Sequence, residues 1–156
     1  HSDPKLVLVP ATPAQVRLTW HRTGIEWGKG LTLDQYLDRE VMLQATDFAQ
    51  SHMTVYVLVP DNDRETREPL AHCDVFERPA VHIQGKTVVQ SGLAYSIASV
   101  FCPPAYRGWG YASMMMDQLY TILKTKPNSL ASTLYSDIGP DFYARFGWRT
   151  YPAQQI

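Results

Sequence analysis

The segment VFCPPAYRGWGYA, residues 100–112, carries the strongest structural signal in this sequence. It ends a long run with few charges, Thr87–Phe101, which predicts a central strand. Pro103 and Pro104 stop that strand, and apolar residues then recur with helical spacing over Trp109–Lys124. We therefore predict a strand, a glycine-containing turn and a helix in immediate succession.

The predicted turn has the features of an anion-binding site. Arg107, Gly108, Gly110 and Ala112 lie around it, and small residues let a ligand approach the backbone closely. The first N–H groups of a helix have no partner within the helix, and together with the helix dipole they attract an anion such as a pyrophosphate. Two known phosphate loops fit less well, because Tyr111 follows the second glycine and because the turn comes late in the chain. A tight turn without a ligand would use the same glycines.

Outward from this segment, the sequence predicts strands and helices in a mixed order. Strands are predicted where β-branched and apolar residues run together or alternate, and helices where a capping box or helical spacing occurs. The predicted strands are Lys5–Val9, Met53–Val59, Leu70–Arg78, Thr87–Phe101, Leu130–Ser136 and Trp148–Tyr151. The predicted helices are Pro13–Arg22, Thr32–Gln50, Trp109–Lys124 and Gly139–Gly147, with loops at Thr23–Leu31 and Asp61–Glu68. The order β-α-α-β-β-β-α-β-α-β predicts an α/β (α+β) fold with a mixed sheet.

Length and composition exclude several classes of protein. The chain has 156 residues, which suits one domain, and 45% of them are apolar, which suits a folded core. Fourteen basic and fifteen acidic residues give a net charge of −1, which argues against nucleic-acid binding through a general basic field. No apolar run approaches the ~20 residues that span a membrane. Cys73 and Cys102 predict free thiols in a reducing compartment, the cytoplasm, and no residues have metal-ligand spacing.

Two motifs in the second half of the chain resemble those of a known family. Arg107-x-x-Gly110-x-Ala112 is similar to the acetyl-CoA signature Gln/Arg-x-x-Gly-x-Gly/Ala of the GCN5-related N-acetyltransferases, or GNAT proteins. The segment DFYARFGW, residues 141–148, resembles the last motif of the same superfamily. The segments LVLVPATPAQ, SVFCPPAYRGWGYA and LYSDIGPDFYARFGW narrow the resemblance to fungal proteins that transfer acetyl from acetyl-CoA to the ε-amine of free lysine.

The resemblance implies roles for the residues in these motifs. The strand Ala98–Cys102 would run beside the pantetheine arm of acetyl-CoA, and an N–H near Val100 would polarise the thioester carbonyl. Tyr143 matches a tyrosine that protonates the leaving thiolate, although packing beside Phe142 and Phe146 is the alternative. The cofactor-binding residues implied are Val100, Phe101, Cys102, Arg107, Gly108, Trp109, Gly110, Tyr111 and Ala112.

The general base and the acceptor stay open at this point. The predicted strand Thr87–Phe101 contains no Asp or Glu, so Asp74 and Glu77 on the neighbouring strand are the candidates, with Asp74 preferred. Each of them could instead solvate a hairpin edge. A small primary amine, free lysine, is the expected partner. A protein or peptide acceptor and a non-catalytic acyl-CoA-binding module are the alternatives.

The end of the sequence predicts an incomplete sheet. The superfamily's sheet normally closes with a hairpin after the last helix. Only Trp148–Tyr151 can form its first strand here, and the residues Pro152–Ile156 are too few for a turn and a partner strand. We expect a further segment or a second chain to complete the sheet and part of the amine pocket of this single domain.

Overall fold

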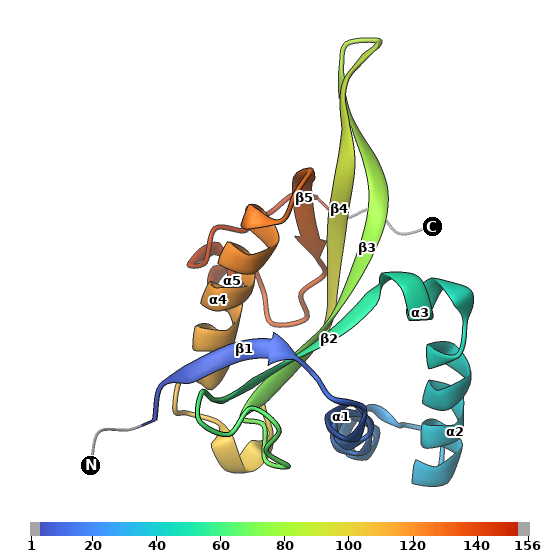
Figure 1. Ribbon diagram of the computed structural model, residues 1–156, viewed down its shortest axis with the longest axis vertical. Helices are drawn as coiled ribbons and strands as arrows, with labels where there is room; N and C mark the ends of the chain where they lie inside the picture. Colours follow the sequence, from blue (N-terminus) through green and yellow to red (C-terminus); the bar gives the residue numbers. More distant parts are fainter. Residues whose placement is uncertain (1–3, 153–156) are drawn as a thin grey trace.

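A five-stranded sheet organises the protein, whose computed structural model describes residues 4–152 (Figure 1). The strands lie across the sheet in chain order, as β1 (Leu6–Pro10), β2 (Met53–Pro60), β3 (Ala71–Gln84), β4 (Thr87–Phe101) and β5 (Ser129–Leu134). Neighbouring strands pair antiparallel, except that β4 and β5 pair parallel. The predicted α/β fold with a mixed sheet is confirmed.

Helices cover the two faces of this sheet (Figure 1). They are α1 (Pro13–Trp27), α2 (Leu33–Gln44), α3 (Asp47–His52), α4 (Tyr111–Thr125) and the short α5 (Asp141–Ala144). The helix α4 makes the crossover that lets β5 lie parallel to β4. Within residues 4–152, no helix combines the length and the apolar character needed to cross a membrane.

The main core lies between the sheet and α4. Successive side chains of a strand point to opposite faces, so Cys73 and Val75 of β3 face α4, whereas His72 and Asp74 face the layer of α1 to α3. The α4 side of the core contains the fully or almost fully buried side chains of Met115, Met116, Leu119 and Leu123. Each such side chain contributes roughly 1.5–3 kcal/mol by leaving water. This packing fixes the N-terminus of α4 against the end of β4.

The first helix is longer than predicted. The expected loop Thr23–Leu31 begins with helix, because α1 continues to Trp27. A Cβ on Gly24 would come within 2.8 Å of the Tyr36 ring, so this glycine allows α1 and α2 to pack closely. The hydroxyl groups of Thr23 and Tyr36 also form a buried hydrogen bond of 2.9 Å. Tertiary packing therefore outweighs the helix-breaking tendency of Gly24.

The predicted helix Thr32–Gln50 is two helices, α2 and α3. Thr32 caps the first one with the predicted capping box. Thr46 interrupts the helical stretch, because its hydroxyl accepts a hydrogen bond from the N–H of Ala49 at 3.2 Å and starts α3.

The predicted strand Trp148–Tyr151 is wrong. This segment has no regular secondary structure, and side chains rather than a backbone ladder attach it to the protein. The indole N–H of Trp148 donates to Ser132 Oγ at 3.1 Å, and its ring lies edge-on to Tyr120. The other predicted elements lie within a few residues of those observed, apart from β3.

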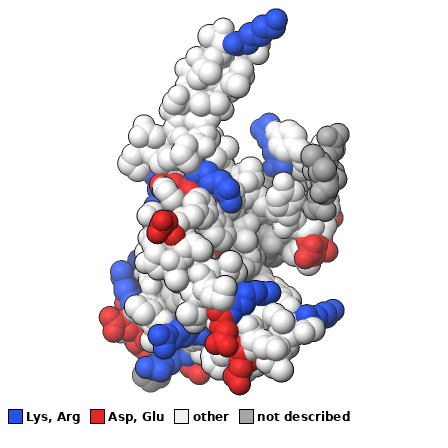
Figure 2. Space-filling view, turned by 90° about the vertical axis from the view of Figure 1, so that its right-hand side faces the viewer, with Lys and Arg blue, Asp and Glu red and all other residues white. Residues whose placement is uncertain are grey.

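The strand β3 extends beyond the predicted end at Arg78. It pairs with β4 from His72 to Gln84 and forms a two-stranded arm that projects from the body (Figure 1). Figure 2 shows the arm as a narrow projection whose visible charge lies at its tip. Pro79 has no N–H to donate to a neighbouring strand, but it does not end β3. At that position β3 pairs only with β4, so no second strand needs a hydrogen bond from it.

Candidate active site

The end of β4 is free on the side of β5. The two strands pair from Leu93 to Ile97 of β4 and from Ser129 to Leu134 of β5. Beyond Ile97, β4 continues to Phe101 while no strand of residues 4–152 pairs with it on that side. Residues 98–101 therefore present backbone N–H and C=O groups that an extended ligand can bind.

A β-bulge shapes the same part of β4. His72 of β3 is opposite Phe101, and Asp74 is opposite Ala98, so that two residues of β4, Ser99 and Val100, lie opposite one residue of β3. Ser99 has a φ of 53°, which is uncommon for a residue with a side chain. A bulge changes the direction of the strand and of its polar groups, and here it does so at the predicted thioester position.

The turn after β4 contains two glycines in the left-handed region. Gly108 and Gly110 have φ values of 84° and 81°, and no atom lies within 4 Å of the place that a Cβ on either would occupy. Gly110 is the N-cap of α4 and makes no side-chain hydrogen bond to the helix. Gly108 and Gly110 thus put no side chain beside the start of this 15-residue helix, whose first N–H groups have no partner within the helix.

Arg107 does not project freely into this space. Its guanidinium donates through Nη2 to both carboxylate oxygens of Glu26, at 2.7 and 2.9 Å, and through Nε to the carbonyl oxygen of Cys102 at 2.9 Å. It also lies 5.6 Å from the centre of the Phe101 ring. The side chain of Arg107, one of the expected cofactor-binding residues, therefore bridges the turn and α1.

The other residues predicted to bind the cofactor divide into backbone and side-chain candidates. The Phe101 side chain is 3% exposed and packs on His72 and Trp27, so only its backbone faces the open edge. The thiol of Cys102 contacts the Leu70 carbonyl oxygen at 3.5 Å, and burial raises its pKa, which suits a packed thiol rather than a nucleophile. The side chain of Trp109 is 74% exposed.

Tyr143 lies in the core on the α4 side of the sheet. Its side chain is 9% exposed and also lines a groove of about 890 Å³ between β5 and residues 147–152. Burial raises its pKa, and the nearby Cys73 and Asp137 raise it further. The phenol therefore stays protonated near neutral pH, as a proton donor must.

Asp74 lies on the opposite face of β3. Burial raises the pKa of its carboxyl group to about 7, with a smaller rise from Glu40 and an opposing effect of a hydrogen bond with Ser99. That hydrogen bond joins Asp74 to the bulge of β4. The structure thus connects Asp74 with the open end of β4, but it does not place Asp74 and Tyr143 on one face.

Glu77, the other candidate for the general base, and the nearby His72 both have other partners. Glu77 is opposite Tyr95 in the ladder and accepts a hydrogen bond from its hydroxyl. His72 is 1% exposed and stacked on Phe101, and burial lowers its pKa to about 3. His72 is therefore a neutral core residue.

Comparison with known proteins agrees with this geometry. The family described as "Acetyltransferase (GNAT) domain" matches residues 78–151, which contain the open end of β4, the glycine turn and Tyr143. Residues 78–151 belong to the GNAT acetyltransferase superfamily. The expected family is thereby confirmed.

Two curated relatives resemble this GNAT chain over most of its length. A protein of Yarrowia lipolytica called "Lysine acetyltransferase" is 31% identical over 88% of the chain, and an uncharacterized protein of Saccharomyces cerevisiae is 25% identical over 96%. The aligned regions cover 38% and 45% of those two proteins. The chain therefore spans less than half the length of the curated relatives that it matches.

Solved structures share the fold of this chain. A GCN5-related N-acetyltransferase from Ralstonia eutropha aligns with a TM-score of 0.67 and 17% identity, covering 97% of both chains. A predicted acetyltransferase from Clostridium acetobutylicum, solved with acetyl-CoA, aligns with a TM-score of 0.64 and 16% identity over 97% of this chain and 95% of its own. At these identities the likeness concerns the fold.

Sequence reasoning missed two features of this site. The first is the bridge between Arg107 and Glu26, whose residues lie 81 positions apart and in different predicted elements. The second is Glu40 on α2, which lies near enough to Asp74 to affect its pKa. A single sequence carries no local signal for either contact.

Proposed function

We propose that this chain is an acetyl-CoA-dependent N-acetyltransferase that acts on a primary amine. One observation carries the proposal: the unpaired end of β4 leads directly into a turn whose two glycines leave open space at the N-terminus of α4. An extended amide chain can bind the first part, and a pyrophosphate can bind the second. The residues present therefore fit an acyl-CoA.

The backbone would do most of the binding. N–H groups of residues 108–112 would donate to the pyrophosphate, because side chains do not cover them at Gly108 and Gly110. Residues 98–102 would pair with the amides of the pantetheine arm, and an N–H near Val100 would stabilise the oxygen that becomes negative during acyl transfer. Acetyl-CoA supplies the acetyl group as an activated thioester.

Asp74 and Tyr143 would move the protons of the reaction. A carboxylate with a pKa of about 7 can accept a proton from the attacking amine near neutral pH, directly or through a water ordered by Ser99. As the C–N bond forms and the C–S bond breaks, the phenol of Tyr143 would donate its proton to the sulfur. The two groups lie on opposite faces of the sheet, so the reacting atoms would lie between them at the open end of β4.

The ε-amine of free lysine is the acceptor that we propose. Support for it comes from the Yarrowia lipolytica relative, whose name states the acetylation of lysine. Lysine has an amine pKa of ~10.4, so it must lose a proton before attack, which is the task assigned to Asp74. Mass spectrometry of acetyl-CoA, lysine and the protein would detect acetyl-lysine directly.

A glycine substitution tests the donor site. Gly110→Val adds a branched side chain where the backbone must approach the pyrophosphate, and we expect coenzyme A affinity to fall at least about 30-fold in calorimetry. Gly85→Val is the matched control, because Gly85 also has a positive φ of 64° and open space around it, but lies at the tip of the arm. Equal affinity in a folded Gly110→Val protein would show that the donor site is elsewhere.

A further inference from the structure

Two polar bridges begin on one face of α1 and restrain the turn of residues 107–110, which we call the coenzyme turn. One ends on Arg107 in the turn itself, and the other ends on Glu68, which also binds Tyr106 just before the turn. Arg22 and Glu26 are four residues apart, so they lie on the same side of the helix. Glu26 accepts two hydrogen bonds from Arg107, and Arg22 pairs with Glu68 at 3.3 Å. Neither bridge is needed to build α1, whose own hydrogen bonds run along the helix.

The bridge from Glu26 restrains the turn at its first residue. Arg107 uses Nη2 for Glu26 and Nε for the carbonyl oxygen of Cys102, so its side chain connects α1 with the end of β4. Trp27, the next residue of α1, adds an edge-on contact with the Phe101 ring at 5.3 Å. The carboxylate neutralises the guanidinium, which leaves recognition of an anion in the turn to backbone N–H groups.

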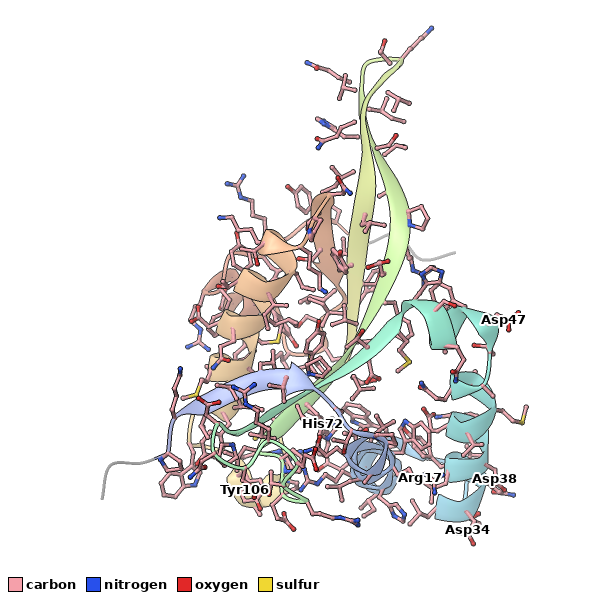
Figure 3. The ribbon with its side chains drawn as sticks, viewed as in Figure 1. Arg17, Asp34, Asp38, Asp47, His72 and Tyr106 are labelled. Atoms are coloured by element: carbon pink, nitrogen blue, oxygen red, sulfur yellow. The ribbon has the colours of Figure 1, made fainter. Side chains whose placement is uncertain are left out.

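The second bridge restrains the segment just before the turn. Arg22 donates to the carbonyl oxygen of Pro69 at 2.7 Å, and Glu68 accepts a hydrogen bond of 2.9 Å from the hydroxyl of Tyr106. Tyr106 ends the short 3-10 helix η1 (Pro104–Tyr106) and lies edge-on to Tyr111, the first residue of α4. Figure 3 shows Tyr106 at the same end of the molecule as α1.

We propose that Glu26, supported by Arg22, is a positioning residue for the coenzyme: it holds Arg107 as a brace of the turn and not as a ligand of the pyrophosphate. This inference rests on the proposed function. Gly108 and Gly110 leave the turn conformationally free, so its N–H groups converge on one anion only if neighbouring structure restrains them. The restraint comes from α1 through Arg107.

The two possible roles of Arg107, a brace of the turn or a direct ligand of the pyrophosphate, predict opposite changes in coenzyme A affinity for Glu26→Gln. If Arg107 bound the pyrophosphate itself, Glu26 would compete for the guanidinium, and removing its charge would strengthen coenzyme binding. If Arg107 braces the turn, removing the charge loosens the turn and weakens binding. We expect coenzyme A affinity to fall about 5-fold, the upper end for a partly exposed ion pair with two hydrogen bonds.

A double-mutant cycle measured by calorimetry makes this test sharper. Arg107→Gln should weaken coenzyme A binding by about as much as Glu26→Gln, and the double variant should be no weaker than the worse single variant. Asp61→Asn is the matched control, because it removes an exposed ion pair with Arg64 in the β2–β3 loop. It should leave coenzyme A affinity unchanged.

Two further readouts separate a brace from general loss of structure. Acetyl-pantetheine lacks the pyrophosphate, so its affinity should be the same in Glu26→Gln and in the unchanged chain. The KM for acetyl-CoA should rise about 5-fold in Glu26→Gln while kcat and the KM for the amine stay constant. A fall in kcat together with weaker acetyl-pantetheine binding would overturn the inference.

The remaining outcomes are also decisive. Tighter coenzyme A binding by Glu26→Gln, or additive losses in the double variant, would make Arg107 a phosphate ligand and overturn the brace. Unchanged binding by Glu26→Gln would overturn the brace alone, because the proposed function does not need Glu26. Failure of the unchanged chain to bind coenzyme A would overturn the proposed function itself.

Discussion

The coenzyme turn and the two proton-transfer candidates differ in how the chain builds them. The turn is local: residues 100–112 contain the strand end, both glycines and the start of α4. Asp74 and Tyr143 come from distant elements and from opposite faces of the sheet. The proposed binding site for the coenzyme is thus encoded in one segment, whereas the groups proposed to move protons depend on how the layers pack.

This difference has consequences for mutation. A residue in the local turn acts through backbone conformation, so its variants should change binding with little effect on chemistry. A residue in the packed layers acts through burial, which raises the pKa values of both Asp74 and Tyr143. Its variants should change chemistry or stability while coenzyme binding survives. Variants of the two kinds of residue test this separation.

The largest expected effect is that of Asp74→Asn on turnover. Removing a general base costs ~10²- to 10⁴-fold, and we expect kcat/KM for the amine to fall about 100-fold or more at pH 8. In the wild-type protein, the plot of log kcat/KM against pH should also become steeper below pH ~7, where Asp74 takes up a proton. Asp74→Asn should lack this additional slope. Steady-state kinetics between pH 5.5 and ~9 measures both.

Glu77→Gln is the control for the choice of carboxylate. It removes the neighbouring acid on β3, which lies on the face of Tyr95. The extra slope should remain in this variant. A profile that loses its slope in Glu77→Gln and keeps it in Asp74→Asn would exchange the roles of the two residues.

Tyr143→Phe should lower kcat about 100-fold while coenzyme A affinity stays within about 2-fold. The change removes the phenol hydroxyl and keeps the ring that packs edge-on against Phe142. Calorimetry gives the affinity, and turnover at saturating acetyl-CoA gives kcat. Equal losses of binding and turnover would instead assign Tyr143 a structural role.

Asp74→Asn should also stabilise the fold at high pH. The folded-state pKa of about 7 lies above the ordinary aspartate pKa of 3.8, so the folded state holds the proton more tightly. By linkage, the contribution of Asp74 to stability is greatest below pH ~3.8 and is lost as the pH rises toward ~7. The variant's advantage in urea unfolding should therefore grow between pH 4 and ~7 and then level off. An advantage independent of pH would contradict the raised pKa.

The features of the fold and the site that the sequence predicted depend on local contacts, and those that it missed depend on contacts between distant residues. Capping boxes at Thr12 and Thr32 and the long charge-poor run of β4 act over a few residues, so the sequence predicted those elements. The extension of α1 past Gly24 depends on its contact with Tyr36, and the split at Thr46 depends on a competing cap. The bridge from Glu26 to Arg107 exists only after α1 packs beside β4. Contacts between distant residues leave no local pattern to detect.

The smallest expected effect concerns the segment after α5, where a strand was predicted and side-chain contacts were found. Trp148→Phe removes the indole N–H that donates to Ser132 Oγ but keeps an aromatic ring beside Tyr120. A single partly buried hydrogen bond contributes about 1 kcal/mol, so the free energy of unfolding should fall by about that amount. Ser132→Ala should cost the same, and the double variant should cost no more than either single variant, because both remove one bond.

If the segment were instead held by a backbone ladder, each substitution would leave the stability nearly unchanged and the two small effects would add. Urea unfolding of the four proteins would separate these cases, and coenzyme A affinity should be constant across them because the bond between Trp148 and Ser132 involves no residue of the glycine turn.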